Sequence, residues 1–496
     1  MISQTLRDAR RYEETYGNQI KKEERPAFHL SSRVGWMNDP NGFSYYDGKY
    51  HMFYQYHPFS SAWGSMHWGH ATSSDLLHWE FLPAALAPDK LYDKDGCFSG
   101  SAIALPDGRQ LLMYTGVCAE QLPDGTHRDV QTQCLAVGDG VNYEKFEQNP
   151  VLTSKNLPEG GSRFDFRDPK IWQKSDGTYC CITGNRPADD SGQILMFTSK
   201  DGFGWKFRKV FAENKNRLGK MWECPDFFEL DGNAILLVSP QDMLPQGLEY
   251  HNGNGTLCLI GSYDEATDTF IEQYNQAVDY GIDFYAMQTV LTPDGRRVMI
   301  GWMQNWDACN IRDTHTSWFG QMSLPRELSV KNSRLYQKPI RELEQFRCNK
   351  IEHKNVSFTG TIHLEGIRGR VIDMELMLRP DDTSDLFRKF AVRFAQNECY
   401  HTALSFRPSE SVVKIDRKFS GSRKAIIHQR RALVDGSEGY LKLRIILDRY
   451  SVEIFVNDGE QVLTATMYTE QEADGIIFFA DGKVCIDVVK YDLNLG

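Results

Sequence analysis

The segment WMNDPNGFSYYDGKYHMFYQY, from Trp36 to Tyr56, decides the fold, because its Asp47-Gly48 pair separates two runs rich in apolar and aromatic residues. Asp-Gly between two such runs is a strong β-hairpin signal, since both residues accept the positive φ of a type I′ turn. Four more Asp-Gly pairs precede apolar runs in the same way: Asp107-Gly108, Asp176-Gly177, Asp231-Gly232 and Asp294-Gly295. A hairpin that recurs in this way indicates one structural unit built several times around a common axis.

The residue eight positions before each pair is the second regular feature of the repeat. These residues are Asp39, Ser99, Asp168, Glu223 and Ala286. Three of the five are acids, and equivalent positions of a repeat face in equivalent directions. The repeat therefore predicts that three carboxylates lie around one point, which is the outline of an active site.

The spacing of the pairs favours a five-bladed β-propeller over residues 26–330. Successive pairs are 60, 69, 55 and 63 residues apart. These intervals are long for a four-stranded blade, but the offset of eight residues is kept despite the variable loops. Asp-Gly also occurs elsewhere in this region, for instance at Asp124-Gly125. A β-rich sandwich with ordinary hairpins is therefore the alternative.

The rest of the chain predicts three further regions. Residues 1–25 are expected to form a helix that ends near Gly17, followed by a charged linker. Residues 331–354 are expected to be a linker with a short helix, because LYQKPIRELEQFR has helical spacing. Residues 355–496 alternate apolar and polar side chains, as in RYSVEIFVNDGEQVLTATMY, and predict a β-sandwich that supports the propeller.

Composition narrows the class of protein. The chain has 496 residues, of which 41% are hydrophobic and 25% charged, as in a soluble globular protein of two or three domains. Its net charge of −11, without a basic tract, argues against nucleic acid as a partner. Aromatic residues make up 12% of the chain. They suit a β-rich core, and they also suit stacking on sugar rings.

The cysteines and the first residues of the chain predict a cytoplasmic protein. Eleven cysteines are scattered without framework or CxxC spacing, which is typical of reduced, mostly buried thiols. The charged start MISQTLRDARRYEETYG contains no apolar run of signal-peptide length, and no window reaches the length of a membrane span. No HExxH helix or cysteine pair suggests a bound metal, and no cofactor is expected.

Each of the three acids lies in a short motif that bears on its chemistry. Pro40 restricts Asp39 to extended geometry and so fixes the direction of its carboxylate, although residues 38–42 also read as a simple turn. Arg167 precedes Asp168 and is expected either to hold that acid ionised or to contact substrate at the rim, with a surface ion pair as the alternative. Glu223 stands between an aromatic residue and a cysteine. Such apolar neighbours are expected to raise its pKa and to suit it to general acid catalysis.

Several carboxylates that face one pocket, together with many aromatic residues and no recognisable set of metal ligands, are typical of enzymes that cleave glycosidic bonds. Several ordered segments resemble the signature blocks of glycoside hydrolase family 32, the family of invertases, fructan hydrolases and sucrose-6-phosphate hydrolases. The segments are WMNDPNG, FYQ (Phe53 to Gln55), WGHATSSDLLHW (Trp68 to Trp79), FSGSA (Phe98 to Ala102), FRDPK, WECPD and SLPREL (Ser323 to Leu328). In the C-terminal region, LDRYSVEIFVNDG is similar to a motif of that family's sandwich domain.

The resemblance implies a five-bladed propeller followed by a β-sandwich, in agreement with the repeat. It also implies roles for the acids, with Asp39 as nucleophile, Glu223 as acid/base and Asp168 as a stabiliser that hydrogen-bonds fructose hydroxyls. The residues it places in the fructose subsite are Asn38, Gln55, Trp63, Phe98, Ser99 and Arg167, to which the shorter segments DFYAMQ and GWM add Tyr285 and Trp302. The N-terminal helix lies outside these blocks, and the family implies no role for it.

The sequence therefore predicts a retaining β-fructofuranosidase that acts on a small sugar without metal or organic cofactor. Sucrose 6-phosphate is the expected substrate, with sucrose accepted less well, because sucrose imported by phosphotransfer reaches the cytoplasm phosphorylated. The alternatives are an exo-acting fructan hydrolase, a fructosyltransferase, an inverting pentose-polymer hydrolase and a non-catalytic sugar-binding propeller. The sequence gives no oligomeric state.

Overall fold

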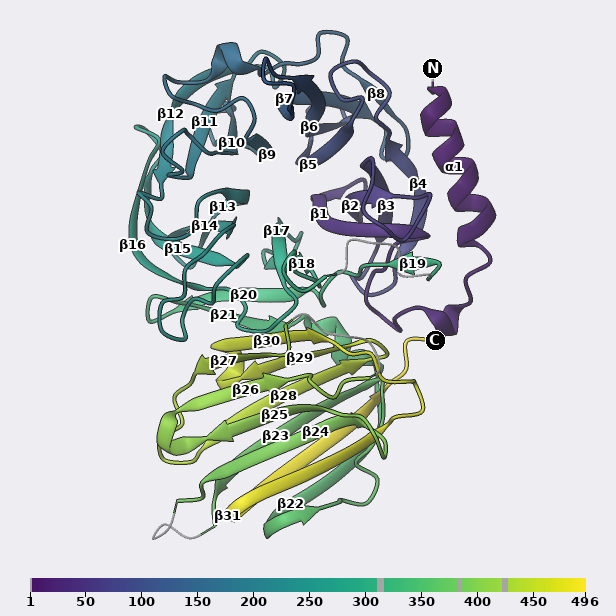
Figure 1. Cartoon of the computed structure of the whole chain (residues 1–496), viewed down its shortest axis with the longest axis vertical. Coiled ribbons are helices and arrows are strands. Elements are labelled where there is room, and N and C mark those ends of the chain that lie inside the picture. Colours follow the sequence, from purple (N-terminus) through teal and green to yellow (C-terminus); the bar gives the residue numbers. More distant parts are fainter. Residues whose placement is uncertain (1, 310–315, 382–385, 422–426) are drawn as a thin grey trace.

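A computed structural model describes residues 2–309, 316–381, 386–421 and 427–496, and it confirms the predicted fold class. Five β-sheets surround a central axis, and a β-sandwich packs below them (Figure 1). In every blade the first strand lies nearest the axis, and the following strands are added outwards by antiparallel pairing. The chain thus builds the propeller blade by blade, in the order in which the Asp-Gly hairpins occur.

The strands of the blades have the following bounds. Blade one contains β1 (Gly35–Tyr46), β2 (Lys49–His57), β3 (His67–Ser73) and β4 (Glu80–Leu86). Blade two contains β5 (Gly96–Ala104), β6 (Gln110–Gln121), β7 (His127–Gly138) and β8 (Tyr143–Lys145). Blade three contains β9 (Phe166–Gln173), β10 (Tyr179–Asn185), β11 (Gln193–Ser199) and β12 (Lys206–Glu213). Blade four contains β13 (Trp222–Leu230), β14 (Asn233–Pro240), β15 (Leu257–Asp264) and β16 (Thr269–Ala277), and blade five contains β17 (Tyr285–Leu291), β18 (Arg297–Trp302), β20 (Arg326–Lys331) and β21 (Arg334–Pro339).

All five Asp-Gly pairs join the first and second strands of a blade, but their turns are of two kinds. Asp47 and Asp231 have φ of 46° and 50°, as the predicted type I′ turn requires. In the other three pairs only the glycine has positive φ. Two of these turns have a proline before the aspartate, and proline fits the first central position of a type I turn. The glycine then closes the hairpin as a bulge residue.

The ring is closed by a short segment inserted between β18 and β20 of the last blade. Within it, β19 (Trp318–Phe319) runs parallel to the start of β1 in the first blade. The Met322 N–H donates to the Leu30 carbonyl at 2.7 Å, which extends the contact to the residues before β1. Blade five is thereby attached to blade one next to the central axis.

The N-terminal helix α1 (Gln4–Gly17) lies along β4 on the outside of blade one (Figure 1). The Ser3 hydroxyl caps it by accepting the Leu6 N–H at 3.2 Å. The 3₁₀ segments η1 (Lys22–Glu24) and η2 (Ser154–Asn156) are the other short helices of this half of the chain. Among the described residues, no helix combines the length and apolar character that crossing a bilayer requires.

The sandwich consists of two antiparallel sheets that share β22 (Arg347–Ile362) and the long β31 (Gly475–Leu493). The first half of β31 pairs with β24, and its second half pairs with β23. The remaining strands are β23 (Ile372–Pro380), β24 (Lys389–Gln396), β25 (Thr402–Arg407), β26 (Val412–Asp416), β27 (Gln429–Leu433), β28 (Leu441–Asp448), β29 (Ser451–Val456) and β30 (Gln461–Thr466), with the 3₁₀ segments η3 (Arg341–Phe346), η4 (Pro408–Glu410) and η5 (Asn457–Gly459). A continuous apolar core fills the space between the two sheets.

The expected linker at residues 331–354 differs from the structure. The stretch from Arg334 to Pro339 is β21, the outer strand of blade five, and only Arg341–Phe346 is helical. Leu335 and Gln337 are both buried, so this stretch follows the two-residue period of a strand, whereas RELEQF alone keeps helical spacing. The propeller therefore extends to Pro339, and the sandwich begins with β22 at Arg347.

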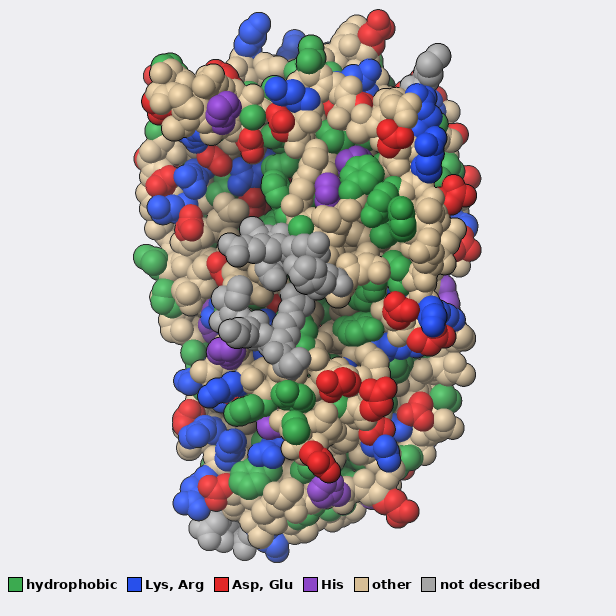
Figure 2. Space-filling view, turned by 45° about the vertical axis from the view of Figure 1, so that its right-hand side comes forward, with side chains coloured by type: hydrophobic (Ala, Val, Ile, Leu, Met, Phe, Trp, Pro, Cys, Tyr) green, Lys and Arg blue, Asp and Glu red, His purple; other side chains and the backbone are tan. Residues whose placement is uncertain are grey.

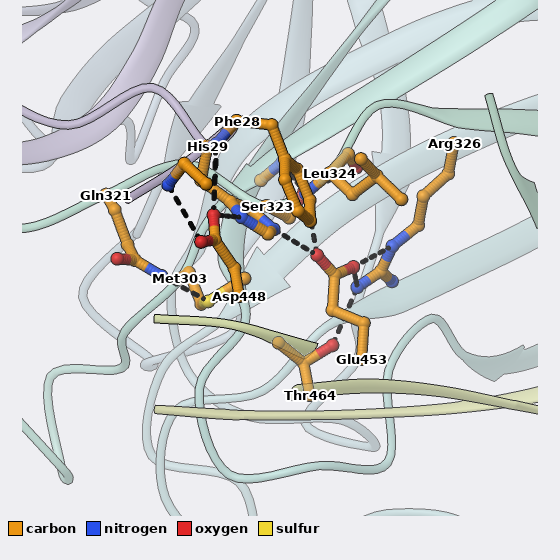
Figure 3. A network of polar contacts seen from close by, with 12 residues as sticks. Phe28, His29, Met303, Gln321, Ser323, Leu324, Arg326, Asp448, Glu453 and Thr464 are labelled. Carbon is orange, nitrogen blue, oxygen red and sulfur yellow. Dashed lines mark hydrogen bonds and ion pairs between the residues drawn. The ribbon is translucent and has the colours of Figure 1, made fainter. Parts of the chain in front are cut away.

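A fully buried ionic network joins the propeller to the sandwich (Figure 3). The two ring nitrogens of His29 lie 2.7 Å from Asp448 Oδ2 and 2.9 Å from Glu453 Oε1. Arg326 on β20 donates to Glu453 through Nε at 2.9 Å and forms an ion pair of 2.9 Å with Asp279. His29 and Arg326 belong to the propeller, whereas their partners Asp448 and Glu453 belong to the sandwich. The network therefore holds the two domains in one relative position.

Candidate active site

A break in strand register occurs near the same position of every innermost strand. The breaks lie between Met37 and Pro40, Phe98 and Gly100, Arg167 and Lys170, Glu223 and Asp226, and Tyr285 and Gln288. Such bulges re-aim side chains and are frequent beside active sites. Asp168, with φ of 64°, adopts the left-handed conformation itself. The bulges thus turn the repeated position of each blade towards the centre.

At this centre lies a cavity of about 550 Å³, which contains all three predicted acids. Its walls come from all five blades. The lining residues are Asn38, Asp39, Gln55, Trp63, Met66, Phe98, Ser99, Arg128, Asp129, Gln131, Phe164, Asp165, Arg167, Asp168, Glu223, Gln241 and Trp306. The size suits a small sugar, and the walls combine carboxylates with aromatic side chains.

Asp39 is held by donors on both carboxylate oxygens. Asn38 Nδ2 donates to Oδ1 at 3.0 Å, and the Ser99 hydroxyl donates to Oδ2 at 2.8 Å. The thiol of Cys224 lies 3.6 Å from the same Oδ2. Burial, together with the charge of Glu223, raises the pKa of Asp39 to about 6, while these hydrogen bonds act in the opposite direction. At neutral pH the group is mainly ionised and has a fixed orientation.

Asp168, like Asp39, contacts the Cys224 thiol. Its Oδ2 accepts the Cys224 N–H at 2.9 Å and lies 3.6 Å from the sulfur. Burial and then the charge of Glu223 raise the pKa of Asp168 to about 7, although Arg167 opposes this. The expectation that Arg167 keeps Asp168 ionised is therefore not met, because burial and the charge of Glu223 outweigh the effect of the guanidinium on this pKa.

Glu223 is surrounded by donors rather than by the expected apolar groups. Its Oε1 accepts Arg167 Nε at 2.9 Å. Its Oε2 accepts the Tyr285 hydroxyl at 2.6 Å and Gln241 Nε2 at 2.9 Å. The adjacent Trp222 is fully buried and donates to the Leu218 carbonyl instead. The hydrogen-bond donors to Glu223 therefore come from blades three and five and from the end of β14 in its own blade, and not from the flanking residues of the motif.

The predicted substrate-binding residues fall into two groups. Asn38, Gln55, Trp63, Phe98, Ser99 and Arg167 line the cavity. Tyr285 and Trp302 do not, because both are fully buried behind its wall. The Tyr285 hydroxyl donates to Glu223, whereas Trp302 packs edge-on against Trp306 at 4.8 Å between ring centroids. Trp306, from the same blade, lines the cavity.

Eight lining residues were not found from the sequence: Met66, Arg128, Asp129, Gln131, Phe164, Asp165, Gln241 and Trp306. Asp129 and Gln131 alternate along β7, a pattern that becomes informative only once the inward face of that strand is known. Phe164 and Asp165 precede the FRDPK motif directly. The Arg167 guanidinium hydrogen-bonds Gln131 and Asp165 at 3.3 and 3.0 Å, so these two residues fix its orientation.

Among the described residues, no group of three histidine, cysteine, aspartate or glutamate side chains is arranged to hold a metal ion. The chemistry that the cavity offers is that of its carboxyl groups. Of the three predicted acids, Asp39 and Asp168 have pKa values raised mainly by burial, whereas Glu223 is held by three hydrogen-bond donors. Pairs of carboxyl groups with different environments are the usual basis for acid, base and nucleophile roles in glycoside hydrolysis.

Family models match nearly the whole chain. The N-terminal domain model of the glycosyl hydrolases family 32 matches residues 29–339, and the C-terminal model of the same family matches residues 342–493. The chain belongs to glycosyl hydrolase family 32. The resemblance of its motifs is thereby confirmed, and this family 32 member is a glycoside hydrolase.

Relatives and solved structures agree with the assignment to family 32. The raffinose invertase of Escherichia coli is 37% identical over 463 residues, which cover 92% of both chains. A sucrose-6-phosphate hydrolase of Escherichia coli is 35% identical and covers 93% of both. A variant of the Bombyx mori β-fructofuranosidase BmSUC1 in complex with sucrose superimposes with a TM-score of 0.84, at 32% identity over 100% of this chain and 99% of that chain. The sucrose-6-phosphate hydrolase of Lactobacillus gasseri gives 0.81 at 28% identity, over 100% and 97%.

Proposed function

We propose that this family 32 enzyme is a retaining β-fructofuranosidase that releases terminal β-D-fructosyl units, with sucrose 6-phosphate and sucrose as its substrates. The main support is that Asp39, Asp168 and Glu223 come from three different blades and meet in one cavity. The relatives add to this support, since they are named as raffinose invertase and sucrose-6-phosphate hydrolases.

In the first step, Asp39 attacks the anomeric C2 of fructose and Glu223 protonates the glycosidic oxygen. Asp39 is buried and held by donors on both oxygens, as a positioned nucleophile has to be. Glu223 accepts hydrogen bonds on both carboxylate oxygens, from Arg167 and from Tyr285 and Gln241, which orient it for proton transfer to the leaving group. The C2–O bond to the leaving sugar breaks while a C2–O bond to Asp39 forms.

In the second step, Glu223 takes a proton from water, and the water oxygen replaces Asp39 at C2. Two displacements at the same carbon give retention of configuration. Asp168, buried beside Asp39, is placed to bind fructose hydroxyls. Since its raised pKa lies near neutrality, the carboxyl cluster holds a proton close to pH 7.

A phosphate on the leaving glucose requires a cation at the mouth of the cavity, and Arg128 meets this requirement. Its guanidinium carbon lies 4.1 Å from the centroid of the Phe164 ring, and the side chain is 48% exposed. Its ion pair with Asp165 is long, at 3.9 Å. Arg128 is therefore available for a charge-assisted bond to phosphate.

Two kinetic comparisons test the substrate assignment. Wild-type kcat/KM is expected to be higher for sucrose 6-phosphate than for sucrose, and Arg128→Ala is expected to reduce the value for the phosphorylated sugar selectively. Arg163→Ala is the matched control, because Arg163 contacts the same Phe164 ring at 4.7 Å but is paired with Glu120. Equal kcat/KM values for the two sugars, or a higher value for sucrose, would refute the preference for the phosphorylated sugar, and a preference for inulin or levan would favour the fructan hydrolase instead.

The stereochemistry of the first product tests the mechanism. NMR of the early product is expected to show β-fructofuranose before mutarotation, whereas early α anomer would indicate an inverting hydrolase. A protein that releases no fructose from any of these sugars would be a sugar-binding propeller. A product mixture dominated by transfer to a second sugar would make it a fructosyltransferase.

The proposed location is the cytoplasm, where sugars taken up by phosphotransfer arrive phosphorylated. Support comes from buried free thiols such as those of Cys97, Cys134, Cys180 and Cys181. Burial raises the pKa of the Cys134 thiol to about 12, so these groups are inert and structural. Fractionation of the native host, with the activity assayed in each fraction, tests this location.

A further inference from the structure

The N-terminal helix touches the loop that forms one side of the cavity mouth. Residues 58–66, here called the rim loop, connect β2 to β3 and include Trp63, whose side chain lines the cavity and is 44% exposed. Figure 2 shows hydrophobic side chains gathered between the right-hand edge of this face, where α1 lies, and its centre. Phe59 of the rim loop and Tyr16 of α1 are among the exposed aromatic residues, at 39% and 47%.

Tyr12 of α1 makes the direct contact. Its hydroxyl donates to the Phe59 carbonyl at 3.3 Å, and its ring meets the Phe59 ring edge-on with 5.2 Å between centroids. One side chain thus binds both the backbone and the ring of the same rim-loop residue. Edge-on aromatic pairs of this kind are favourable and orient both rings.

From Phe59 the packing continues to Trp63. The Phe59 ring also lies edge-on against His57, at 5.7 Å between centroids. The His57 ring in turn rests on Gly64, where a Cβ atom would come within 2.8 Å of the imidazole. Gly64 directly follows Trp63, so its position sets the backbone from which the indole projects. A contiguous path of packed groups therefore leads from the helix to the aromatic residue at the cavity mouth.

The helix α1 is itself firmly bound to blade one, which it has to be if it is to hold the rim loop in place. Arg10 Nε donates to the Ala84 carbonyl at 2.9 Å, and the Glu13 carboxylate accepts the Ala84 N–H at 2.8 Å. Leu6 and Ala9 are buried on the same side of the helix. Arg10 and Glu13 flank Tyr12 in sequence, so the residue that contacts the rim loop lies at the most firmly attached part of α1.

We propose that α1 positions the rim loop, with Tyr12 as the positioning residue for Trp63, and thereby sets the affinity of the enzyme for the leaving-group sugar. The family resemblance placed Trp63 in the fructose subsite, but its 44% exposure puts the indole at the cavity mouth, so its aromatic face meets the sugar that extends out of the cavity rather than the enclosed fructose. The kinetic part of this proposal rests on the proposed fructosidase activity. Its structural part, the hold of Tyr12 on the rim loop, is independent of any substrate.

Hydrogen–deuterium exchange of residues 58–66 tests the structural part. Tyr12→Ala is expected to increase exchange in the rim loop without changing the innermost strands. Tyr12→Phe keeps the ring contact and is expected to stay close to wild type. Tyr16→Ala is the matched control, since Tyr16 lies on the same helix and its described ring contact is with Tyr12 itself. Unchanged rim-loop exchange in Tyr12→Ala overturns the proposal.

Kinetics with two substrates test the functional part. For sucrose, Tyr12→Ala is expected to raise KM about fivefold to tenfold with little change in kcat, which corresponds to about 1 to 1.4 kcal/mol. For methyl β-D-fructofuranoside, whose leaving group has no ring to stack, KM is expected to stay within about twofold of the wild-type value. An equal loss on both substrates, or a loss in kcat alone, overturns the specificity role. Wild-type enzyme inactive on both substrates would refute the fructosidase assignment instead.

Discussion

Asp39 and Ser99 occupy the same position in successive blades, and a hydrogen bond of 2.8 Å joins their side chains between the innermost strands of these two blades. They are 60 residues apart in sequence, and each lies at a bulge of an innermost strand. The repeat thus places a hydroxyl where it can stabilise the neighbouring blade's carboxylate. Ser99, one of the two non-acidic members of the repeated set, therefore stabilises the carboxylate of one of its three acids.

Ser99→Ala should shift the acid limb of the pH–rate profile to higher pH. The Ser99 bond lowers the pKa of Asp39, which burial otherwise raises to about 6. Without the bond the carboxylate takes up a proton at higher pH, and the nucleophile is lost earlier on acidification. Activity at pH 6 should fall more than activity at pH 8. Ser44→Ala, also on β1 but bonded to the Gly42 carbonyl, should leave the profile in place.

Asp39→Ala and Glu223→Ala should each lower kcat by roughly 10²-fold to 10⁴-fold or more while the fold is kept, since both act in the transition state. Added azide should restore part of the activity of Glu223→Ala, because a small anion can replace water and its base in the second step. It should not rescue Asp39→Ala, which lacks the nucleophile. Near-normal turnover by Asp39→Ala would rule out the double displacement.

Tyr285→Phe tests a residue that the motifs placed at the sugar but the structure places under Glu223. Its hydroxyl donates to Glu223 at 2.6 Å and has no access to the cavity. Removing the donor should lower kcat about tenfold, the effect of about 1.4 kcal/mol. KM for sucrose should change little. A large rise in KM with unchanged kcat would indicate direct contact with substrate.

The sequence allowed the fold and the three acids to be predicted because both depend on local, repeated signals. Asp-Gly turns mark the hairpins, and a constant offset identifies one position of each innermost strand. Asp39, Asp168 and Glu223 needed no knowledge of packing. The β-sandwich was equally accessible, since strict alternation is itself the signal for a strand with one buried face.

What could not be predicted depends on neighbours far apart in sequence. The partners of Glu223 come from β9, from the end of β14 and from β17, whereas the flanking Trp222 and Cys224 point elsewhere. Arg128 lies in no motif, and its place at the cavity mouth follows only from the curvature of the blades. Around Leu335 the sequence fits the spacing of a helix and the alternation of a strand equally well over a few residues. The stretch forms a strand because it pairs with β20.

Gly320→Ala should destabilise the closure of the propeller ring. Gly320 has φ of +95°, and a Cβ there would lie 2.1 Å from the Met37 carbonyl oxygen. Gly48→Ala is the matched control, since its φ of +78° imposes similar strain but its Cβ would meet open space. Left-handed backbone costs alanine about 1–2 kcal/mol, so Gly48→Ala should lose about that much. Urea unfolding should show a clearly larger loss for Gly320→Ala, and equal losses would mean that the contact with β1 is unimportant.

The interdomain network predicts a specific dependence of stability on pH. Burial alone would lower the pKa of His29, but hydrogen bonds to Asp448 and Glu453 outweigh it and raise that pKa from 6.5 to about 9. Both ring nitrogens face carboxylates, so both have to donate, and the folded state binds a proton that the unfolded chain releases above pH 6.5. The stabilisation is therefore complete below about pH 6.5 and is lost as the pH rises through about 9.

Thermal unfolding of the wild type should accordingly show a Tm that falls between pH 6.5 and pH 9. His29→Gln should unfold at lower temperature throughout, because Asp448 and Glu453 then lack a cation between them, and its Tm should no longer fall across this range. His363→Gln, a change at an exposed histidine of the sandwich, should keep the wild-type dependence. If His29→Gln loses stability with pH as the wild type does, the proton is bound elsewhere, and His29 contributes to the interface only through its neutral hydrogen bonds.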